Sequence, residues 1–532
     1  MALFRPNEWA FTEKALEWVT TNPFDPSGTD KTMDHPAWVA QGAISWRPGA
    51  ELWGPRSVYY DDLHERTTEM GERLRRRMRD GPSACQASEV ELARYELLSV
   101  YCLYCQIGET MDRIIDSAVR GQRSSEGQAS QEEERRRVLK MLWEGFEREY
   151  VSMFHLANFD FPTRYEPHHL FACFFVFRRA FYHIFFNIIG TSDAIARLRS
   201  KVWDSIVTHN LLDWMQGLHE RMIDIPTLII GPSGTGKERV AEAIGRSLYI
   251  PFDPKKKAFE IDFMAAFNPV NLSALPSLLI EAEMFGHVKG AFANAVRDRI
   301  GRLEACPQRG AVFLDEIGEL TAEIQVKMLR VLQTRRFQRV GANEDKEFRG
   351  KIIAATNRDL AAEMQARRFR EDFYYRLCAD QIATPSLGEQ LEDRPEDLPM
   401  MVEFVCRWVV GEEKAGGFAR EVVDWINSHL RGYTWPGNFR ELEQCVRSYT
   451  IRKEYYPAQP ARPKGNEELP QPARDPLREA CNELADAVLD EKITYDEIKR
   501  RLFTLVRRGT HTDKKAAELL QCDVRTLRKH LS

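Results

Sequence analysis

The segment Gly231-Pro-Ser-Gly-Thr-Gly-Lys237 decides the fold of this 532-residue chain. An apolar run, Thr227-Leu-Ile-Ile230, precedes it and a helical pattern follows, which is the context of a P-loop between a buried strand and a helix. Its glycines let backbone N–H groups wrap phosphates, and Lys237 reaches the outer phosphates. We therefore expect ATP to be bound by Gly231, Ser233, Gly234, Thr235, Gly236, Lys237 and Glu238, the last of which replaces the usual Ser or Thr.

Two acidic residues end a second apolar strand, Val312-Phe-Leu-Asp-Glu316. A buried strand has no structural need for adjacent carboxylates at its tip, so we expect Asp315 to hold Mg²⁺ through water and Glu316 to polarise the attacking water. A third strand, Lys351 to Ala355, leads into Asn357, whose amide can orient the γ-phosphate or the water. This set predicts ATP hydrolysis within an α/β core of parallel strands.

Five further motifs resemble the sigma-54 interaction domain of bacterial enhancer-binding activators, which is an AAA+ ATPase. They are Gly286-His-Val-Lys-Gly-Ala-Phe292, Phe313-Leu-Asp-Glu-Ile-Gly-Glu-Leu320, Ala354-Ala-Thr-Asn-Arg-Asp-Leu360, Phe369-Arg-Glu-Asp-Phe-Tyr-Tyr-Arg-Leu377 and Trp435-Pro-Gly-Asn-Phe-Arg-Glu-Leu442. The resemblance covers residues 188–442, nearly half of the chain, and a Glu after the P-loop lysine is common in that family. The stretch from Trp203 to Asp224 is longer than expected and resembles an inserted or extended helix pair.

The resemblance implies roles for further residues. Arg370 and Arg376 match arginine fingers that a neighbouring subunit inserts toward the γ-phosphate, which implies a homo-oligomeric ring, and we expect a hexamer. Arg440 matches the sensor arginine of a helical lid, and Asn271 matches an asparagine that restrains the catalytic Glu. The loop that contacts sigma-54 holoenzyme reads GAFTGA in the family and is here Gly290, Ala291, Phe292, Ala293, Asn294 and Ala295, so a Thr and a Gly are replaced.

The first 186 residues show helical patterns without strand–helix alternation, so we expect a helical N-terminal domain of unknown input. Ser130 and Glu133 predict the start of one helix by a capping box. The aromatic run in Phe171 to Phe186 and the pair Cys102 and Cys105 are interpreted as core, with a ligand pocket or metal chemistry as the alternative. The most apolar segment, Leu170 to Ile189, is interrupted by Arg178, Arg179 and His183, and its longest charge-free run before them is eight residues. The N-terminus lacks a signal peptide, and both features favour a cytoplasmic protein without membrane spans.

The C-terminal end is basic, whereas the rest of the chain is acidic. Residues 499–532 hold ten Lys/Arg and three Asp/Glu, a net charge of +7, so the remainder carries −12 of the total of −5. Residues 514–531 read as helix, turn, helix and resemble a Fis-type helix-turn-helix, whose second helix would meet an upstream DNA site. The DNA-facing candidates are Arg525, Thr526, Arg528, Lys529 and His530.

The sequence therefore predicts a multidomain protein with an all-α C-terminal domain. The expected parts are a helical N-terminal domain (1–186), an α/β AAA+ core (187–398), a helical lid (399–453), a linker (454–476) and a helix-turn-helix (477–532). The function expected is ATP-driven activation of sigma-54 transcription. Two alternatives are an AAA+ regulator that remodels another target, which the altered loop supports, and a DNA-binding regulator that uses ATP only to assemble.

Overall fold

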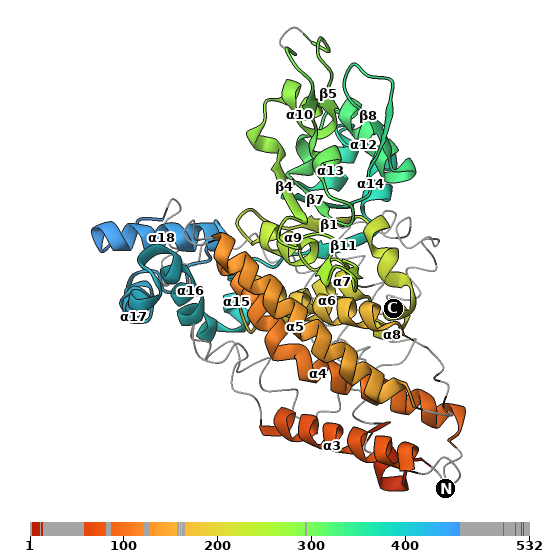
Figure 1. The fold of residues 1–532 in the computed structure, drawn as a ribbon. Helices are drawn as coiled ribbons and strands as arrows, with labels where there is room; N and C mark the ends of the chain where they lie inside the picture. Colours follow the sequence, from red (N-terminus) through yellow and green to blue (C-terminus); the bar gives the residue numbers. More distant parts are fainter. Residues whose placement is uncertain are drawn as a thin grey trace. The chain divides into compact units, whose positions relative to one another are not determined.

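The structure is a computed structural model, and it describes residues 3–10, 12–13, 58–80, 87–121, 128–156, 159, 161, 165–292 and 295–457, with 504, 517, 523 and 525 as single positions. The chain divides into two compact units, residues 1–461 and 462–532. All the labelled helices and strands belong to the first unit (Figure 1). The predicted linker beyond residue 457 and the helix-turn-helix lie outside the described residues, apart from the four single positions.

The described N-terminal part is mainly helical, which confirms the prediction. Its helices are α3 (Val58–Asp80), α4 (Glu89–Gly121), α5 (Gln128–Phe154) and α6 (Pro167–Asn187), and α4 packs against the other three. The predicted helix start at Ser130 is wrong by two residues, because α5 already begins at Gln128 and Ser130 lies inside its first turn. Cys102 is a buried core residue of α4, as expected, and burial raises the pKa of its thiol to about 12.

Helix α6 contains the aromatic run and is buried along most of its length, which confirms the core interpretation. It lies between α4 and the helix that follows the P-loop, α9 (Lys237–Gly245). Two adjacent arginines within α6 are buried because each has polar partners. Arg178 forms an ion pair with Asp112 of α4, while Arg179 donates to the backbone oxygens of Arg246 and Leu248 at 2.9 and 2.7 Å. Arg179 therefore supplies donors and positive charge at the C-terminal end of α9.

The α/β core contains a five-stranded parallel sheet in the order β11-β1-β10-β7-β4. Its strands are β1 (Thr227–Ile230), β4 (Phe267–Asn271), β7 (Ala311–Asp315), β10 (Lys351–Thr356) and β11 (Asp380–Ala383). The three predicted strands are confirmed as parallel neighbours. Since β10 lies between β1 and β7, the segments that follow these three strands meet at one edge of the sheet.

Alternate residues along the central strands face two different cores. Ile229, Phe313 and Ile353 join the core that also contains the N-terminal helices and α9. Leu228, Val312 and Ile352 face a second core, formed with α12 (Ala322–Thr334) and α14 (Glu371–Leu377). The period of two along each strand thus places helices on both faces of the sheet, as a buried parallel sheet requires. The N-terminal helices and the sheet share one continuous core.

Shorter elements connect these layers. Before β1 come α7 (Asp193–Val207), α8 (Leu211–Gln216) and two 3₁₀ turns, η1 (Leu218–Glu220) and η2 (Met222–Asp224). The expected helix pair at 203–224 is therefore the end of α7, one short helix and two turns. The remaining elements of the core are β2 (Phe252–Asp253), β3 (Ala258–Phe259), η3 (Leu272–Ala274), α10 (Ser277–Phe285), β5 (Gly286–His287), β6 (Arg299–Ile300), α11 (Arg302–Ala305), η4 (Ile317–Glu319), β8 (Arg336–Gln338), β9 (Asp345–Glu347) and α13 (Leu360–Gln365).

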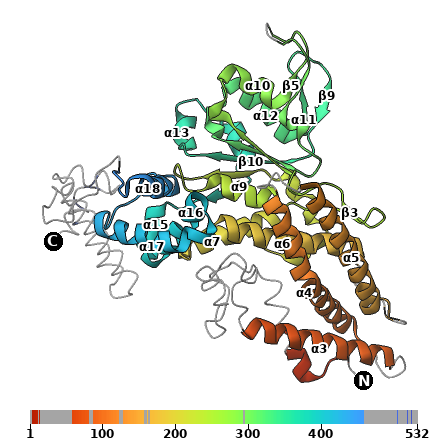
Figure 2. The same ribbon diagram turned by 60° about the vertical axis from the view of Figure 1, so that its left-hand side comes forward.

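The helical lid has its own core. It comprises α15 (Leu387–Asp393), η5 (Pro395–Asp397), α16 (Leu398–Val410), α17 (Glu412–His429) and α18 (Asn438–Arg452), and Figure 2 shows these helices gathered near α9. Helix α18 ends at Arg452, close to the predicted end of the lid. Within the described part of the chain, no helix carries an apolar stretch long enough to cross a bilayer. The predicted domain boundaries themselves stay predictions.

Candidate active site

The P-loop connects β1 to α9 and has the backbone conformation that its glycines permit. Gly234 and Gly236 have φ of 79° and 90°, in the left-handed region where side chains are disfavoured. A Cβ on Gly234 would lie 2.4 Å from the backbone oxygen of Gly437 in the lid. The loop can therefore approach the lid only because residue 234 has no side chain.

Lys237 begins α9 and is mostly buried, as a P-loop lysine should be. Its Nζ donates to the backbone oxygens of Gly231 and Pro232 at 2.9 and 3.0 Å, so the amine is held over the loop. Burial lowers the pKa of this amine, and the nearby carboxylates of Glu316 and Asp315 oppose that shift. These interactions bring the two predicted groups, the phosphate-binding lysine and the acidic pair, into one electrostatic environment.

Asp315 and Glu316 stand at the C-terminal end of β7, one strand away from β10 and two from β1. Burial raises the pKa of the Asp315 carboxyl, the Glu238 carboxylate adds to the rise, and Lys237 opposes it. The charge of Glu238 is therefore felt at Asp315. The carboxylate of Asp315 is the hard oxygen ligand type that Mg²⁺ prefers, although within the described residues no group of three His, Cys, Asp or Glu side chains is gathered closely enough to hold a metal by itself.

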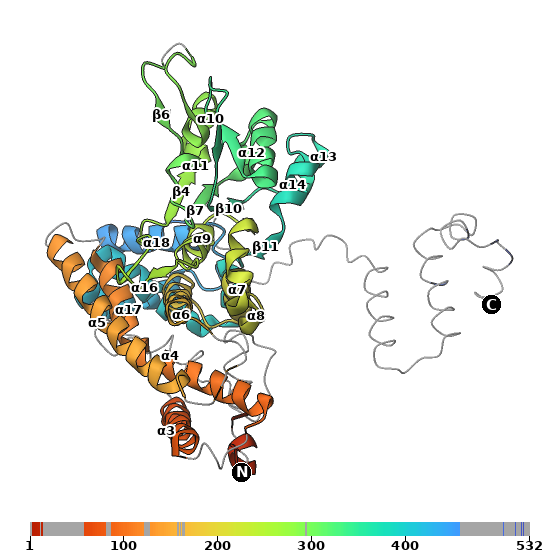
Figure 3. The ribbon, with the colours of Figure 1, turned by 45° about the vertical axis from the view of Figure 1, so that its right-hand side comes forward.

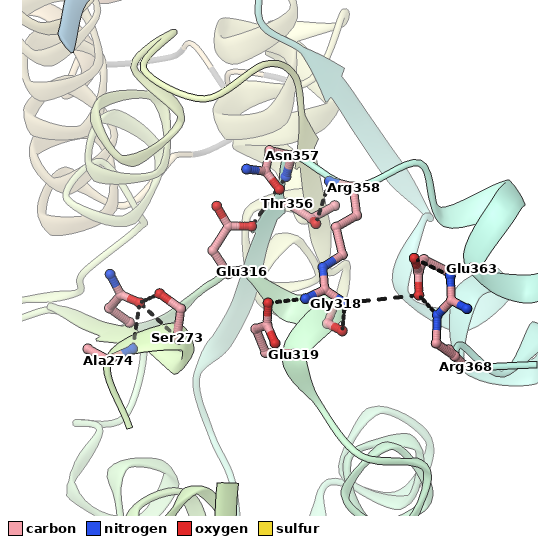
Figure 4. Close-up of polar contacts among 11 residues, drawn as sticks. Ser273, Ala274, Glu316, Gly318, Glu319, Thr356, Asn357, Arg358, Glu363 and Arg368 are labelled. Atoms are coloured by element: carbon pink, nitrogen blue, oxygen red, sulfur yellow. Dashed lines mark hydrogen bonds and ion pairs between the residues drawn. The ribbon is translucent and has the colours of Figure 1, made fainter. Parts of the chain in front are cut away.

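Glu316 has a φ of 58°, an unusual conformation for a residue with a side chain. Its Oε2 accepts a hydrogen bond from the backbone N–H of Asn357 at 3.3 Å, as Figure 4 shows. The contact joins the end of β7 to the end of β10. Strained backbone of this kind is frequent at active sites, and here it turns the carboxylate toward the segment after β10.

Asn271 ends β4 and is paired in register with Asp315. Its Oδ1 accepts hydrogen bonds from the backbone N–H groups of Ser273 and Ala274 and from the Ser273 hydroxyl. These bonds cap the 3₁₀ turn η3, and none of the hydrogen bonds described for Asn271 involves Glu316. The restraint of Glu316 by Asn271 stays a prediction.

The lid reaches the P-loop through the start of α18. Arg440 Nη1 donates to Ser233 Oγ at 2.7 Å, so the predicted sensor arginine lies at the phosphate-binding loop. The backbone N–H of Phe439 donates to the oxygen of Gly234 at 3.1 Å. Lid and P-loop are thus hydrogen-bonded by side chain and backbone together.

Asn438 is a residue of this contact that the sequence analysis quoted without a role. It is 2% exposed and has a φ of 54°. Its Nδ2 donates to the backbone oxygen of Ser233 at 2.9 Å, and its Oδ1 accepts from the backbone N–H of Leu387 at 2.7 Å. One amide thereby bridges the P-loop and the start of α15. Its place in the Trp-Pro-Gly-Asn turn was the only available signal, because both partners are remote in sequence.

The two predicted finger arginines lie at α14, on the far side of the second core from α9. Arg370 immediately precedes the helix and pairs with Asp372, with nitrogen–oxygen distances of 3.0 and 2.7 Å. Its side chain is 45% exposed, and Arg376 is exposed on the last turn. Neither arginine approaches the chain's own P-loop through any described hydrogen bond, and exposed positions are what insertion into another subunit requires.

The predicted sigma-contact loop follows the short strand β5, which pairs with β6 in the arm at the top of Figure 3. Gly290 has a φ of 82°, and its N–H donates to the oxygen of Ala295 at 2.8 Å, which closes the loop. Phe292 is 38% exposed and its ring lies 4.9 Å from the His287 ring. Ala293 and Asn294 lie outside the described residues. Among the DNA-binding candidates, Arg525 is a single described position and exposed, and Thr526, Arg528, Lys529 and His530 are not described.

Comparison with known proteins identifies the α/β core. Residues 208–383 match the family model of the sigma-54 interaction domain. A Nif-specific regulatory protein of Klebsiella pneumoniae is 42% identical over 231 residues, which are 43% of this chain and 40% of that protein. The transcriptional regulatory protein GlrR of Escherichia coli K12 is 40% identical over 227 residues, which are 42% of this chain and 47% of that protein.

A longer match joins this chain to the hydrogenase transcriptional regulatory protein HoxA of Bradyrhizobium diazoefficiens, which is 38% identical over 273 residues. That alignment covers 50% of this chain and 52% of HoxA. The chain spans about half the length of the curated relatives that it matches. A solved structure of NtrX from Brucella abortus aligns at 21% identity and a TM-score of 0.37, over 74% of this chain and 84% of that one. Residues 208–383 of this chain therefore match a sigma-54 interaction domain, and the region around them is similar to part of several transcriptional regulatory proteins.

Proposed function

We propose that this protein hydrolyses ATP at the interfaces of a homo-oligomeric ring and uses the energy to remodel sigma-54 RNA polymerase holoenzyme. One observation carries the proposal: Lys237, the Asp315–Glu316 pair and the segment of Asn357 meet at one edge of the sheet, with Arg440 of the lid at the same loop. These are the groups that phosphoryl transfer needs for charge neutralisation and positioning.

Each group has a distinct task in the proposed reaction. The P-loop, Lys237 and Arg440 would bind the triphosphate, and Asp315 would hold Mg²⁺ through water, which neutralises charge on the phosphates. Glu316 would take the proton of the attacking water, and Asn357 would orient that water. Arg370 and Arg376 are exposed and remain free of the chain's own P-loop, which supports their action in trans on a neighbouring subunit and hence a ring, for which we propose a hexamer.

The experiment that tests the hydrolysis compares phosphate release with nucleotide affinity. Glu316→Gln keeps the size of the side chain and removes its basicity, so it should bind ATP normally and release phosphate at least ~100-fold more slowly. The variant Glu319→Gln is a matched control, because Glu319 lies three residues further on and pairs with Arg358. Near-normal phosphate release by Glu316→Gln would refute the assignment of the base.

We further propose that the C-terminal part binds an upstream DNA site and tethers the ring. The support is its net charge of +7 over residues 499–532 and its resemblance to a Fis-type helix-turn-helix. Phosphate contacts by Lys and Arg dominate DNA affinity, whereas base contacts by a recognition helix give specificity. DNA binding and ATP hydrolysis would therefore be separable functions of this chain.

The altered loop favours a second candidate function, remodelling of a target other than sigma-54. Ala293 lacks the hydroxyl of the family's Thr, and Asn294 adds a side chain where the family has Gly. One lost hydrogen bond is worth about 1 kcal/mol, which weakens binding several-fold without abolishing it, and the exposed Phe292 ring remains as an anchor. The double change Ala293→Thr with Asn294→Gly should strengthen sigma-54 binding. If neither the natural protein nor the double variant binds sigma-54, the second candidate function is favoured.

A further inference from the structure

The side chain of Gln325 joins three backbone segments inside the α/β core. It projects from α12 and is fully buried. Its Nε2 donates to the oxygens of Leu320 at 2.8 Å and Arg368 at 3.0 Å, and its Oε1 accepts from the backbone N–H of Arg370 at 2.9 Å. A single amide thus connects the segment that follows Glu316 to the segment that carries the Arg370 finger.

The backbone of Arg370 is fixed on both sides while its side chain is not. Phe369 and Phe373 are buried in the second core, with ring centroids 5.3 Å apart. Between them, the Arg370 N–H bonds to Gln325, and the guanidinium projects outward to an exposed pair with Asp372. The geometry therefore sets where the finger starts and leaves its tip free to exchange Asp372 for another anion.

A second connection runs along the surface between the same two segments. Arg358, next to Asn357, pairs with Glu319 and donates to the oxygen of Gly318 at 3.2 Å. Glu363 lies 4.0 Å from Arg358 and forms a two-pronged pair with Arg368 at 2.7 and 2.9 Å, as Figure 4 shows.

The two connections differ in strength because they differ in burial. Arg358 and Glu319 are each 37% exposed and Arg368 is 62% exposed, and exposed ion pairs of this kind contribute about 0–1 kcal/mol. Removal of the Gln325 amide would instead leave up to three backbone groups without partners, one of them in a buried and two in part-buried hydrogen bonds, which is the costlier change. The buried amide therefore holds the finger segment more strongly than the surface pairs do.

We propose that Gln325 is a positioning residue for the Arg370 finger. It keeps the finger segment in register with the segment after Glu316, so that a subunit's own hydrolysis site and the finger it presents to the next subunit move together. The proposal rests on the proposed function, since it needs fingers that act in trans. Its consequence is that loss of Gln325 impairs the neighbouring subunit's site while leaving nucleotide binding in the subunit's own site intact.

The test uses mixed rings of the full-length chain. Gln325→Met preserves length and volume without hydrogen bonds. Alone, it should bind ATP with wild-type affinity and release phosphate ~10- to 100-fold more slowly, the effect of a finger displaced by about an ångström. Mixed with Glu316→Gln subunits, which have intact fingers but cannot hydrolyse, it should regain phosphate release, because a neighbour now supplies a correctly placed finger. Arg370→Ala mixed in the same way is the positive control.

Two further variants separate positioning from folding. Gln333 is exposed two turns further along α12, so Gln333→Met should retain wild-type phosphate release. Gln325→Glu keeps an acceptor for the Arg370 N–H but sets a buried carboxylate against the oxygens of Leu320 and Arg368, so it should lose at least as much activity as Gln325→Met. Wild-type turnover by Gln325→Met would overturn the proposal. So would a defect that Glu316→Gln subunits do not rescue although they rescue Arg370→Ala. Failure to rescue Arg370→Ala in rings that demonstrably mix would overturn the trans arrangement and, with it, this proposal.

Discussion

Substitution of Asn438 tests the coupling between the lid and the P-loop. In Asn438→Ala, the backbone oxygen of Ser233 in the P-loop loses the donor that reaches it from the lid at 2.9 Å, which costs about 1–3 kcal/mol. The residue also has a φ of 54°, and a left-handed conformation costs Ala about 1 kcal/mol more than Asn. The docked position of the lid should therefore be destabilised by about 2–4 kcal/mol. Because ATP binding needs the docked lid, part of this free energy is lost from the affinity for ATP.

We expect the Kd of Asn438→Ala for ATP to rise ~10- to 100-fold, since each 1.4 kcal/mol is a factor of about ten. The assay is calorimetric or fluorescence titration with ATP in a Glu316→Gln background, where hydrolysis does not consume the ligand. Asn438→Gly removes the same amide but tolerates the positive φ, so its Kd should lie about fivefold below that of the Ala variant. A Kd of Asn438→Ala within twofold of the parent would refute the coupling.

Three other outcomes follow from the site, the core and the charge distribution. Lys237→Ala should abolish ATP binding in the same titration, because no other side chain of the P-loop carries positive charge. Burial lowers the pKa of Lys351 to about 8 from 10.5, so the unfolded chain binds more protons than the folded chain between these pH values. The free energy of unfolding, measured with urea, should therefore rise by up to about 3 kcal/mol between pH 8 and 10.5. The Lys351→Met variant should lack this rise. Deletion of residues 475–532 should remove salt-sensitive DNA binding in a gel shift and leave phosphate release unchanged, whereas an unaltered gel shift would place the DNA site elsewhere.

Features written in local sequence could be predicted. The strands β1, β7 and β10 are short, continuous apolar runs that end in polar residues, and such runs are typical of buried parallel strands. The P-loop and the Asp315–Glu316 pair follow those strands directly, so the sheet order alone brings them together. The helical N-terminal part was equally evident, although the Ser130 capping signal placed the start of α5 two residues late.

Contacts between remote segments could not be predicted. The sequence shows Arg179 only as a charge that interrupts an apolar run. Its hydrogen-bond acceptors, the backbone oxygens of Arg246 and Leu248, come near it only when α6 packs on α9. Gln325 reads as an ordinary polar residue of a helix until the Leu320 and Arg370 segments converge on it. Asn438 is similar. In each case a buried polar side chain satisfies backbone groups far away in sequence, and only the tertiary fold determines which ones.

The most direct test of the account is capture of sigma-54 by the full-length protein in the presence of a transition-state analogue of ATP. We expect sigma-54 to be retained with the analogue, released with ADP, and lost in Phe292→Ala, which keeps the ATPase site intact. Full phosphate release by a protein that retains no sigma-54 in any nucleotide state would contradict the claim that its ATPase acts on sigma-54.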